Sequence, residues 1–173
     1  MDASEEIALR RHVEVARSRL TRPALALMLT ALFQALTSVM YLVLALVGLG
    51  AVLAWVPTAG VNGGAEVAVL AGLVLVLVLV TGVGLLPPLI VIYGALQMRR
   101  MRSYGWAIGA SVLLPSWSVL QLLTAMLFTN IFGVLQLPQF LVSCTVGIWA
   151  FVVLQDLRIY RAYLDAHELG MDH

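Results

Sequence analysis

The apolar positions of this chain fall into long runs that short polar stretches separate. No charged residue lies between Arg22 and Glu66, between Glu66 and Arg99, or between Arg102 and Asp156. A helix needs about 20 apolar residues to cross a hydrocarbon core of roughly 30 Å. The third gap has room for two helices and is broken by FTNIFGVLQLPQ, residues 128–139. The pattern therefore predicts four membrane spans, at about 23–55, 65–98, 103–128 and 137–160.

The segments outside these spans are short. Pro57 and the following TAGVNGG predict a turn-rich link between the first two spans, with the tightest turn at Asn62-Gly63. Residues 1–22 are predicted to form a separate amphipathic helix, whose narrow apolar stripe consists of Leu9, Val13, Ala16 and Leu20. We expect this helix to lie along the inner leaflet and to turn into the first span at Arg22-Pro23. A solvated helix and a docking helix for another protein are the alternatives. Residues 165–173 are predicted to be a cytoplasmic tail.

The arginines predict the orientation of the chain. Five precede the first span, three lie between the second and third, two follow the fourth, and the other two links have none. Positive charge is retained on the cytoplasmic side during insertion. Both termini and the turn with Arg99, Arg100 and Arg102 are therefore expected inside. These three arginines are interpreted mainly as topology determinants, and the functional alternative is a contact with anionic lipid or a partner. Five aromatic side chains are expected at the inner lipid boundary, namely Tyr93, Tyr104, Trp106, Tyr160 and Tyr163.

Composition supports the membrane assignment. The chain is 62% hydrophobic and 11% charged, with a mean hydropathy of +1.00. The expected fold class is all-α: an integral membrane four-helix bundle of antiparallel hairpins with both termini cytoplasmic and an N-terminal amphipathic helix. All ten cations are arginine, which we interpret as the codon usage of a GC-rich bacterial genome, so the expected location is the bacterial cytoplasmic (inner) membrane. A net charge of +1 argues against nucleic acid as a partner.

The chemistry of an intramembrane enzyme is missing from the sequence. No ionisable side chain falls in the interior of any expected span, and all three histidines lie near the termini. Ionisable groups within a membrane are the usual mark of catalysis or ion coupling. We therefore expect no catalytic residue, no metal site, no cofactor and no enzymatic activity. The lone Cys144 is interpreted as a packed, inert thiol.

The spans do offer packing and hydrogen-bonding groups. Small residues suited to close helix contact are Gly105 and Gly109, which form a GxxxG pair, and Gly147 on the fourth span. We expect them to pack within the chain, and contact between protomers is the alternative. Pro87, Pro88 and Pro115 each free a backbone carbonyl. Near the same expected depth lie the residues of a possible mid-membrane polar layer: Gln34, Ser38, Tyr41, Thr81, Ser111, Ser118, Gln121, Ser143 and Thr145. The layer is interpreted as a dry, interlocked core or as a small polar cavity.

Two stretches carry a resemblance to a known group. GALQMRRMRSYGWAIGASVLLP, residues 94–115, and GIWAFVVLQDLRIYRAY, residues 147–163, resemble the C-terminal half of a family of four-span bacterial membrane proteins common in planctomycetes. This chain differs from them in a longer third span and in the absence of a cysteine- and proline-rich link before the fourth. The family has no established activity, so the resemblance implies topology only.

Two functional hypotheses follow. The first is a non-enzymatic membrane protein that acts as a scaffold or accessory subunit of a larger assembly, with the lipid bilayer and a protein partner or second copy as its contacts. The alternative is a small channel or transporter for lipid or an uncharged solute, with a polar cavity at mid-membrane.

Overall fold

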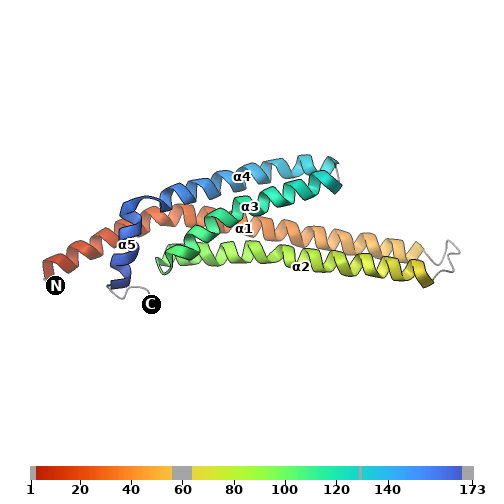
Figure 1. Ribbon diagram of the computed structural model, residues 1–173, viewed down its shortest axis with the longest axis horizontal. Helices are drawn as coiled ribbons and strands as arrows, with labels where there is room; N and C mark the ends of the chain where they lie inside the picture. Colours follow the sequence, from red (N-terminus) through yellow and green to blue (C-terminus); the bar gives the residue numbers. More distant parts are fainter. Residues whose placement is uncertain (1–2, 56–63, 129, 169–173) are drawn as a thin grey trace. The chain divides into compact units, whose positions relative to one another are not determined.

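The computed structural model describes residues 3–55, 64–128 and 130–168, and the elements of this part are α-helices without strands (Figure 1). The five helices are α1 (Ala3–Trp55), α2 (Gly64–Arg100), α3 (Tyr104–Phe128), α4 (Asn130–Leu154) and α5 (Leu157–Glu168). Four of them are long and apolar enough to cross a membrane. The all-α prediction and the four hydrophobic helices are confirmed. The predicted turn at Asn62-Gly63 and the end of the predicted tail lie outside the described residues.

The first helix corrects the prediction of a separate N-terminal helix. α1 continues through Pro23 instead of turning there. The reason is a buried stripe that keeps its phase across the proline, with members at 13, 16, 20, 24, 27 and 31. These steps of three and four residues follow the 3.6-residue period of one straight helix. Pro23 removes one backbone donor, but the packing on both sides of it holds the helix together.

The N-terminal stripe also differs from its predicted environment. Val13, Ala16 and Leu20 are buried within the protein, in the same core as Leu27 and Ala31. A stripe covered by protein is not available to the inner leaflet. The prediction of a surface-lying helix was therefore wrong, because the apolar face of this segment packs within the chain.

The fourth span begins at Gln136, close to the predicted start, but it ends earlier than predicted. α4 starts at Asn130 and includes Pro138, and it ends at Leu154 instead of residue 160. A proline within a membrane helix is tolerated where the rest of the backbone ladder persists. Beyond Leu154, the Asp156 side chain accepts a hydrogen bond from the Arg158 backbone N–H at 2.9 Å. This N-cap arrangement starts a new helix, α5, so the chain breaks where a polar residue can satisfy the free donors.

The helices divide into two compact units. The first consists of Met1–Leu32 and Pro87–His173, and the second is Phe33–Leu86. In the first unit, α3 and α4 lie side by side, and α5 lies across the N-terminal part of α1 (Figure 1). The described hydrophobic core belongs to this unit, and its large members include Leu20, Leu27, Met98, Leu114 and Leu154.

The second unit pairs the later part of α1 with the earlier part of α2 (Figure 1). Its described surface is rich in exposed large apolar side chains, among them Phe33, Leu36, Val43, Val47, Leu73, Val76 and Leu79. Such a surface is unfavourable in water and matches hydrocarbon. The second unit therefore presents a surface of the kind that lipid hydrocarbon covers.

Candidate functional site

The turn between α2 and α3 is a tightly defined helix end. The Met101 N–H donates to the Met98 carbonyl at 3.2 Å, and the Arg102 N–H donates to the Gln97 carbonyl at 3.1 Å. These two bonds form a Schellman motif, which places the residue after the helix in the left-handed region. That residue is Met101, with φ of 54°. Glycine is the usual choice there, but the Met101 side chain is only 4% exposed and contributes to the core.

Two tyrosine hydroxyls bond to carbonyls at helix ends in the same region. The Tyr163 hydroxyl donates to the Met98 carbonyl at 3.3 Å, and the Tyr104 hydroxyl donates to the Leu154 carbonyl at 2.9 Å. Carbonyls in the last turn of a helix have no partner within the helix. The two tyrosines therefore cap the C-terminal ends of α2 and α4, and they connect α3 and α5 to those ends.

The rings of these tyrosines also contact one another. Tyr104 packs edge-on against Tyr160, with centroids 5.1 Å apart, and against Tyr163, at 5.4 Å. Tyr163 is only 6% exposed. Burial raises the pKa of the Tyr163 phenol well above its ordinary value, and the neighbouring Tyr104 phenol raises it further. We call Tyr104, Tyr160 and Tyr163 the tyrosine cluster.

The tyrosine cluster corrects the prediction for one of its members. Tyr163 was expected at the lipid boundary and is instead a core residue. A sequence signal for this role does exist. Ile159, Ala162, Tyr163 and Ala166 recur at helical spacing on α5, and all four are buried. The segment was interpreted as the end of the fourth span, and its amphipathic pattern was missed.

A polar contact links α5 to α1. His12 Nδ1 lies 3.2 Å from Asp165 Oδ2. The pair is 153 residues apart in sequence, so the contact closes the two ends of the chain against each other. It becomes an ion pair when His12 is protonated. Both side chains retain access to solvent, so this contact is a weak addition to the apolar packing of α5.

The arginines remain on the surface. Arg99, Arg100 and Arg102 are all exposed, and the first two lie in the last turn of α2. Cations in this position interact favourably with the negative end of the helix dipole. Within the described residues, the arginine that forms an ion pair is Arg10, whose guanidinium nitrogen lies 2.8 Å from Glu6 Oε1. The guanidinium groups of the turn are thus available to anions from outside the chain.

Two glycines serve close contacts between helices. A Cβ atom on Gly94 would lie 2.5 Å from the Ala110 Cβ and 2.7 Å from the Trp106 carbonyl oxygen. A Cβ on Gly147 would lie 2.6 Å from Pro115 Cδ and 2.8 Å from the Ser111 carbonyl oxygen. Neither position has room for a methyl group. α2 therefore contacts α3 through Gly94, and α4 contacts α3 through Gly147.

The Gly147 contact also explains how a carbonyl freed by proline is covered. Pro115 has no N–H, so the Ser111 carbonyl lacks its usual partner one turn later. A Cβ on Gly147 would point at the Ser111 carbonyl oxygen, so the Cα hydrogen that takes its place in glycine points at the same oxygen. A Cα–H group is a weak hydrogen-bond donor at such a contact. The glycine thus provides both a close approach and a partial substitute for the missing bond.

Gly105 and Gly109 behave differently from Gly94 and Gly147. Both are exposed, and a Cβ on either would meet no described atom within 4 Å. The prediction that the GxxxG pair packs within the chain is therefore wrong for the described structure. The face of α3 that α2 and α4 cover is a different one, formed by Ala107, Ala110 and Leu114.

The hydroxyls of the predicted polar layer bond mainly to their own helices. Each of these hydroxyls donates to a backbone carbonyl oxygen at 2.8–2.9 Å: Ser38 to Gln34, Ser111 to Ile108, Ser118 to Leu114 and Thr145 to Leu141. Backbone carbonyls three or four residues earlier are the local acceptors for Ser and Thr in helices. These bonds leave the hydroxyls with their donor capacity used.

The members of the layer differ in exposure. Gln34, Ser38, Ser111, Ser118 and Ser143 are buried, Tyr41 and Gln121 are half-buried, and Thr145 is exposed. The Thr81 side chain lies outside the described residues. The Gln34 side chain is only 1% exposed, which removes its amide from a lipid environment where its groups would lack partners.

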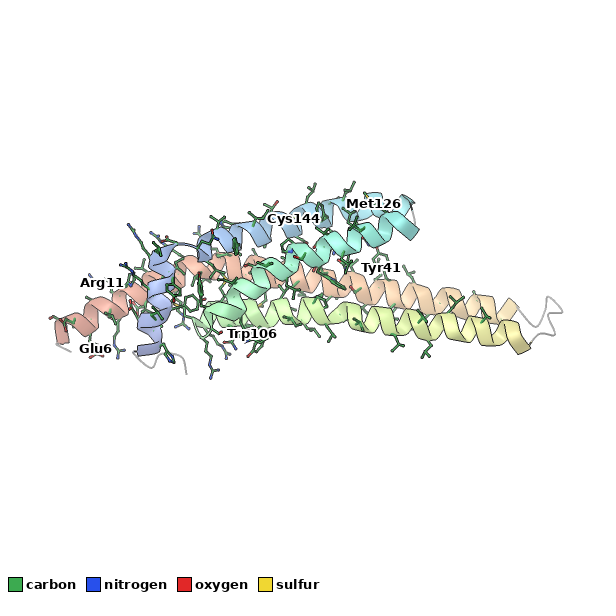
Figure 2. All side chains as sticks on the ribbon, viewed as in Figure 1. Glu6, Arg11, Tyr41, Trp106, Met126 and Cys144 are labelled. Carbon is green, nitrogen blue, oxygen red and sulfur yellow. The ribbon has the colours of Figure 1, made fainter. Side chains whose placement is uncertain are left out.

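Reactive groups are sparse in this part of the chain. Among the described residues, no group of three His, Cys, Asp or Glu side chains could hold a metal ion. Cys144 is a free, half-buried thiol on α4 (Figure 2).

The chain matches no protein-family model, no curated protein and no solved structure.

Proposed function

We propose that the protein is a non-enzymatic scaffold or accessory subunit of a larger membrane assembly. The observation that carries this proposal is the contrast between its glycines. Gly94 and Gly147 are used for packing within the chain, whereas Gly105 and Gly109 present backbone to the outside of α3. In lipid, small residues favour association because they let two helix backbones approach closely. The open GxxxG face is suited to a transmembrane helix of a partner or of a second copy.

The same face continues along α3. Val112 and Ser116 follow Gly109 at helical spacing, and both are exposed. The Ser116 hydroxyl donates to the Val112 carbonyl at 2.8 Å, so it presents its oxygen as an acceptor. Such hydroxyls contribute to helix association in membranes by accepting bonds from a neighbouring helix. Gly105, Gly109, Val112 and Ser116 are defined here as the docking face.

The remaining polar groups of the spans support a structural role. Ser38, Ser111 and Ser118 are buried and bonded to their own backbones. A dry, interlocked interior is the arrangement that these bonds favour. Both termini are proposed to lie in the cytoplasm of a bacterial cell, with the protein in the inner membrane, because the arginines lie in the first unit near the two ends of the chain and at the α2–α3 turn.

One observation favours the alternative of a small channel or transporter. The Trp117 indole N–H is buried, and within the described residues it has no hydrogen-bond acceptor. A buried donor without a partner is costly unless water or a ligand supplies an acceptor. Solute flux through liposomes that contain the purified protein, and its loss in Trp117→Phe, would support transport. Equal flux in protein-free liposomes would contradict it.

The scaffold proposal is tested by filling the docking face. We expect Gly105→Ile with Gly109→Ile to abolish association, because the branched side chains separate the two backbones. Gly82→Ile is the matched control, since Gly82 is also a glycine within a helix whose Cβ would meet no described atom within 4 Å. The measurement is co-purification in mild detergent from the native membrane, followed by native mass spectrometry.

The outcomes separate clearly. The wild-type chain and Gly82→Ile should migrate in a complex larger than the 18.7 kDa monomer, and the double variant should not. A wild-type chain that is a lone monomer without associated protein would refute the scaffold function. A double variant that associates as the wild type does would refute the docking face.

A further inference from the structure

The surface beside the α2–α3 turn combines a cation with an apolar stripe. Leu89, Tyr93, Leu96 and Arg100 follow one another on α2 at steps of four, three and four residues, and all are exposed. These steps place them on one face of the helix. The stripe extends over 12 residues, so that Leu89 and Arg100 are about 16 Å apart along the helix axis at 1.5 Å per residue. That length is close to the depth of one leaflet, which is about half of a 30 Å hydrocarbon core.

The adjoining helix provides a second side for this stripe. Trp106 packs edge-on against Tyr93, with centroids 5.2 Å apart and an interplanar angle of 87°. Each of the two rings is 48% exposed, so the pair remains accessible beyond its mutual contact. Aromatic rings of this kind are enriched where hydrocarbon meets the polar headgroups. The pair lies one to two helical turns from the arginines.

The charged end of the stripe has more than one cation. Arg99 and Arg102 are exposed on either side of Arg100, and the structure shows no carboxylate on these three among the described residues. A guanidinium binds a phosphate through two parallel hydrogen bonds. The two cations of the last turn of α2 and Arg102 in the link that follows therefore provide complementary charge for a phosphate diester. The adjoining stripe on α2 provides apolar surface for its acyl chains.

The backbone that carries these arginines is fixed before any ligand arrives. The Schellman bonds define the turn, Met101 is anchored in the core, and the Tyr163 hydroxyl holds the Met98 carbonyl. A preorganised site loses less conformational entropy on binding than a flexible one does. This feature distinguishes the turn from a flexible basic tail, whose arginines would act only as diffuse charge.

We propose that the α2–α3 turn is a binding site for one anionic phospholipid. Arg100 and Arg102 hold the phosphate, and Arg99 contributes to the positive field. One acyl chain lies along Leu96, Tyr93 and Leu89, beside Trp106. The site is centred on α2 and borders the docking face, because Trp106 precedes Gly109 by three residues and lies about 60° from it around α3. It adds a lipid partner to the scaffold, and it does not depend on the scaffold function.

The test uses the full chain in a neutral detergent with phosphatidylglycerol or phosphatidylcholine of identical acyl chains, and native mass spectrometry counts the retained lipid. We expect phosphatidylglycerol to be retained preferentially, with one tight site. Arg100→Gln with Arg102→Gln should weaken it about 30-fold, from roughly fivefold for each juxtamembrane cation. Arg17→Gln with Arg19→Gln is the control, since both arginines are exposed on α1, and it should change retention less than threefold.

Two further arms identify the source of the phosphate and the role of the stripe. Inorganic phosphate at millimolar concentration should fail to displace the lipid, and Trp106→Ala should weaken retention at unchanged charge. Displacement by inorganic phosphate would overturn the lipid assignment in favour of a free anion. Equal retention of the two lipids, or equal losses in the turn variant and the α1 control, would overturn the site altogether.

Discussion

The contact of Gly147 with Pro115 gives a quantitative prediction. In Gly147→Ala, the new methyl would lie 2.6 Å from Pro115 Cδ and 2.8 Å from the Ser111 carbonyl oxygen. Carbon atoms in favourable contact are about 3.5–4.0 Å apart, so roughly 1 Å of extra room is required. The neighbours are a proline ring and a backbone oxygen, and neither has a free rotamer. The helix α4 must therefore move away from α3 as a body.

The expected magnitude follows from two opposing effects. Overpacking of a well-packed site costs about 1–3 kcal/mol. Replacing glycine by alanine within a helix returns up to about 1 kcal/mol of helix propensity. Gly82→Ala gains the propensity without the clash, because a Cβ there meets no described atom within 4 Å. The difference between the two variants therefore isolates the overpacking, and it should be about 1–3 kcal/mol in favour of Gly82→Ala.

The assay is unfolding in mixed micelles by titration with sodium dodecyl sulfate, followed by far-ultraviolet circular dichroism. Thermal unfolding provides a second measure, and the midpoints of the two variants should differ by about 2–12 °C. If Gly147→Ala is as stable as Gly82→Ala, the close approach of α3 and α4 is not as the structure has it. A Gly147→Ala that exceeds the wild type in stability would refute the same reasoning more strongly.

Four further predictions concern the turn and α5. Met101→Gly should lower the free energy of unfolding by about 1–3 kcal/mol, because the loss of a buried methionine outweighs the relief of the left-handed backbone. Met101→Ala should be less stable still, because it loses the methionine and keeps a Cβ in the left-handed region. The reverse order in chemical denaturation would show that backbone strain dominates. Tyr163→Phe should cost about 0.5–1.5 kcal/mol through the lost bond to Met98, as measured by the same titration, and an unchanged midpoint would exclude that bond as a stabilising contact. Because burial raises the pKa of Tyr163, its neutral form stabilises the fold fully below about pH 10 and less as pH rises further. The alkaline decline in stability should therefore be shallower in Tyr163→Phe, and equal declines would contradict the shift. Asp165→Asn should lower the free energy of unfolding by less than about 1 kcal/mol, since the side chains of His12 and Asp165 are 42% and 27% exposed. A larger loss at pH 5 would show that the contact between His12 and Asp165 stabilises the fold more than an exposed ion pair does.

The sequence by itself determined the positions of the central helices. The second and third spans were expected at 65–98 and 103–128, and α2 and α3 occupy Gly64–Arg100 and Tyr104–Phe128. The physical reason is local. A long apolar run in lipid has to satisfy its backbone groups within itself, and the helix does so. Charged residues end such runs because they are costly in hydrocarbon, so the boundaries could be recognised without any tertiary contact.

Whether a helix continues or ends at a proline or a polar residue near the end of an apolar run was decided by the tertiary structure. Pro23 was expected to end a helix, and it does not, because Leu20 and Leu27 are buried on one continuous face. The fourth span was expected to continue to about residue 160, and instead α4 ends at Leu154 and Asp156 starts α5. The local cost of a proline or the value of a cap is only a few kcal/mol. Packing energies of similar size decide between a kink, a break and a straight helix.

The tertiary structure alone decided which face of each helix is used. Gly105 and Gly109 were expected inside and are exposed, whereas Gly94 was not singled out and is in close contact with α3. Apolar residues surround the membrane helices on every side, so hydrophobic periodicity cannot mark their buried face. α5, which has a polar side, does carry that mark, in Ile159 and Tyr163. Where hydrocarbon and protein interior are equally apolar, burial depends on the shape of the neighbouring helix, and that information is distributed over residues far apart in the chain.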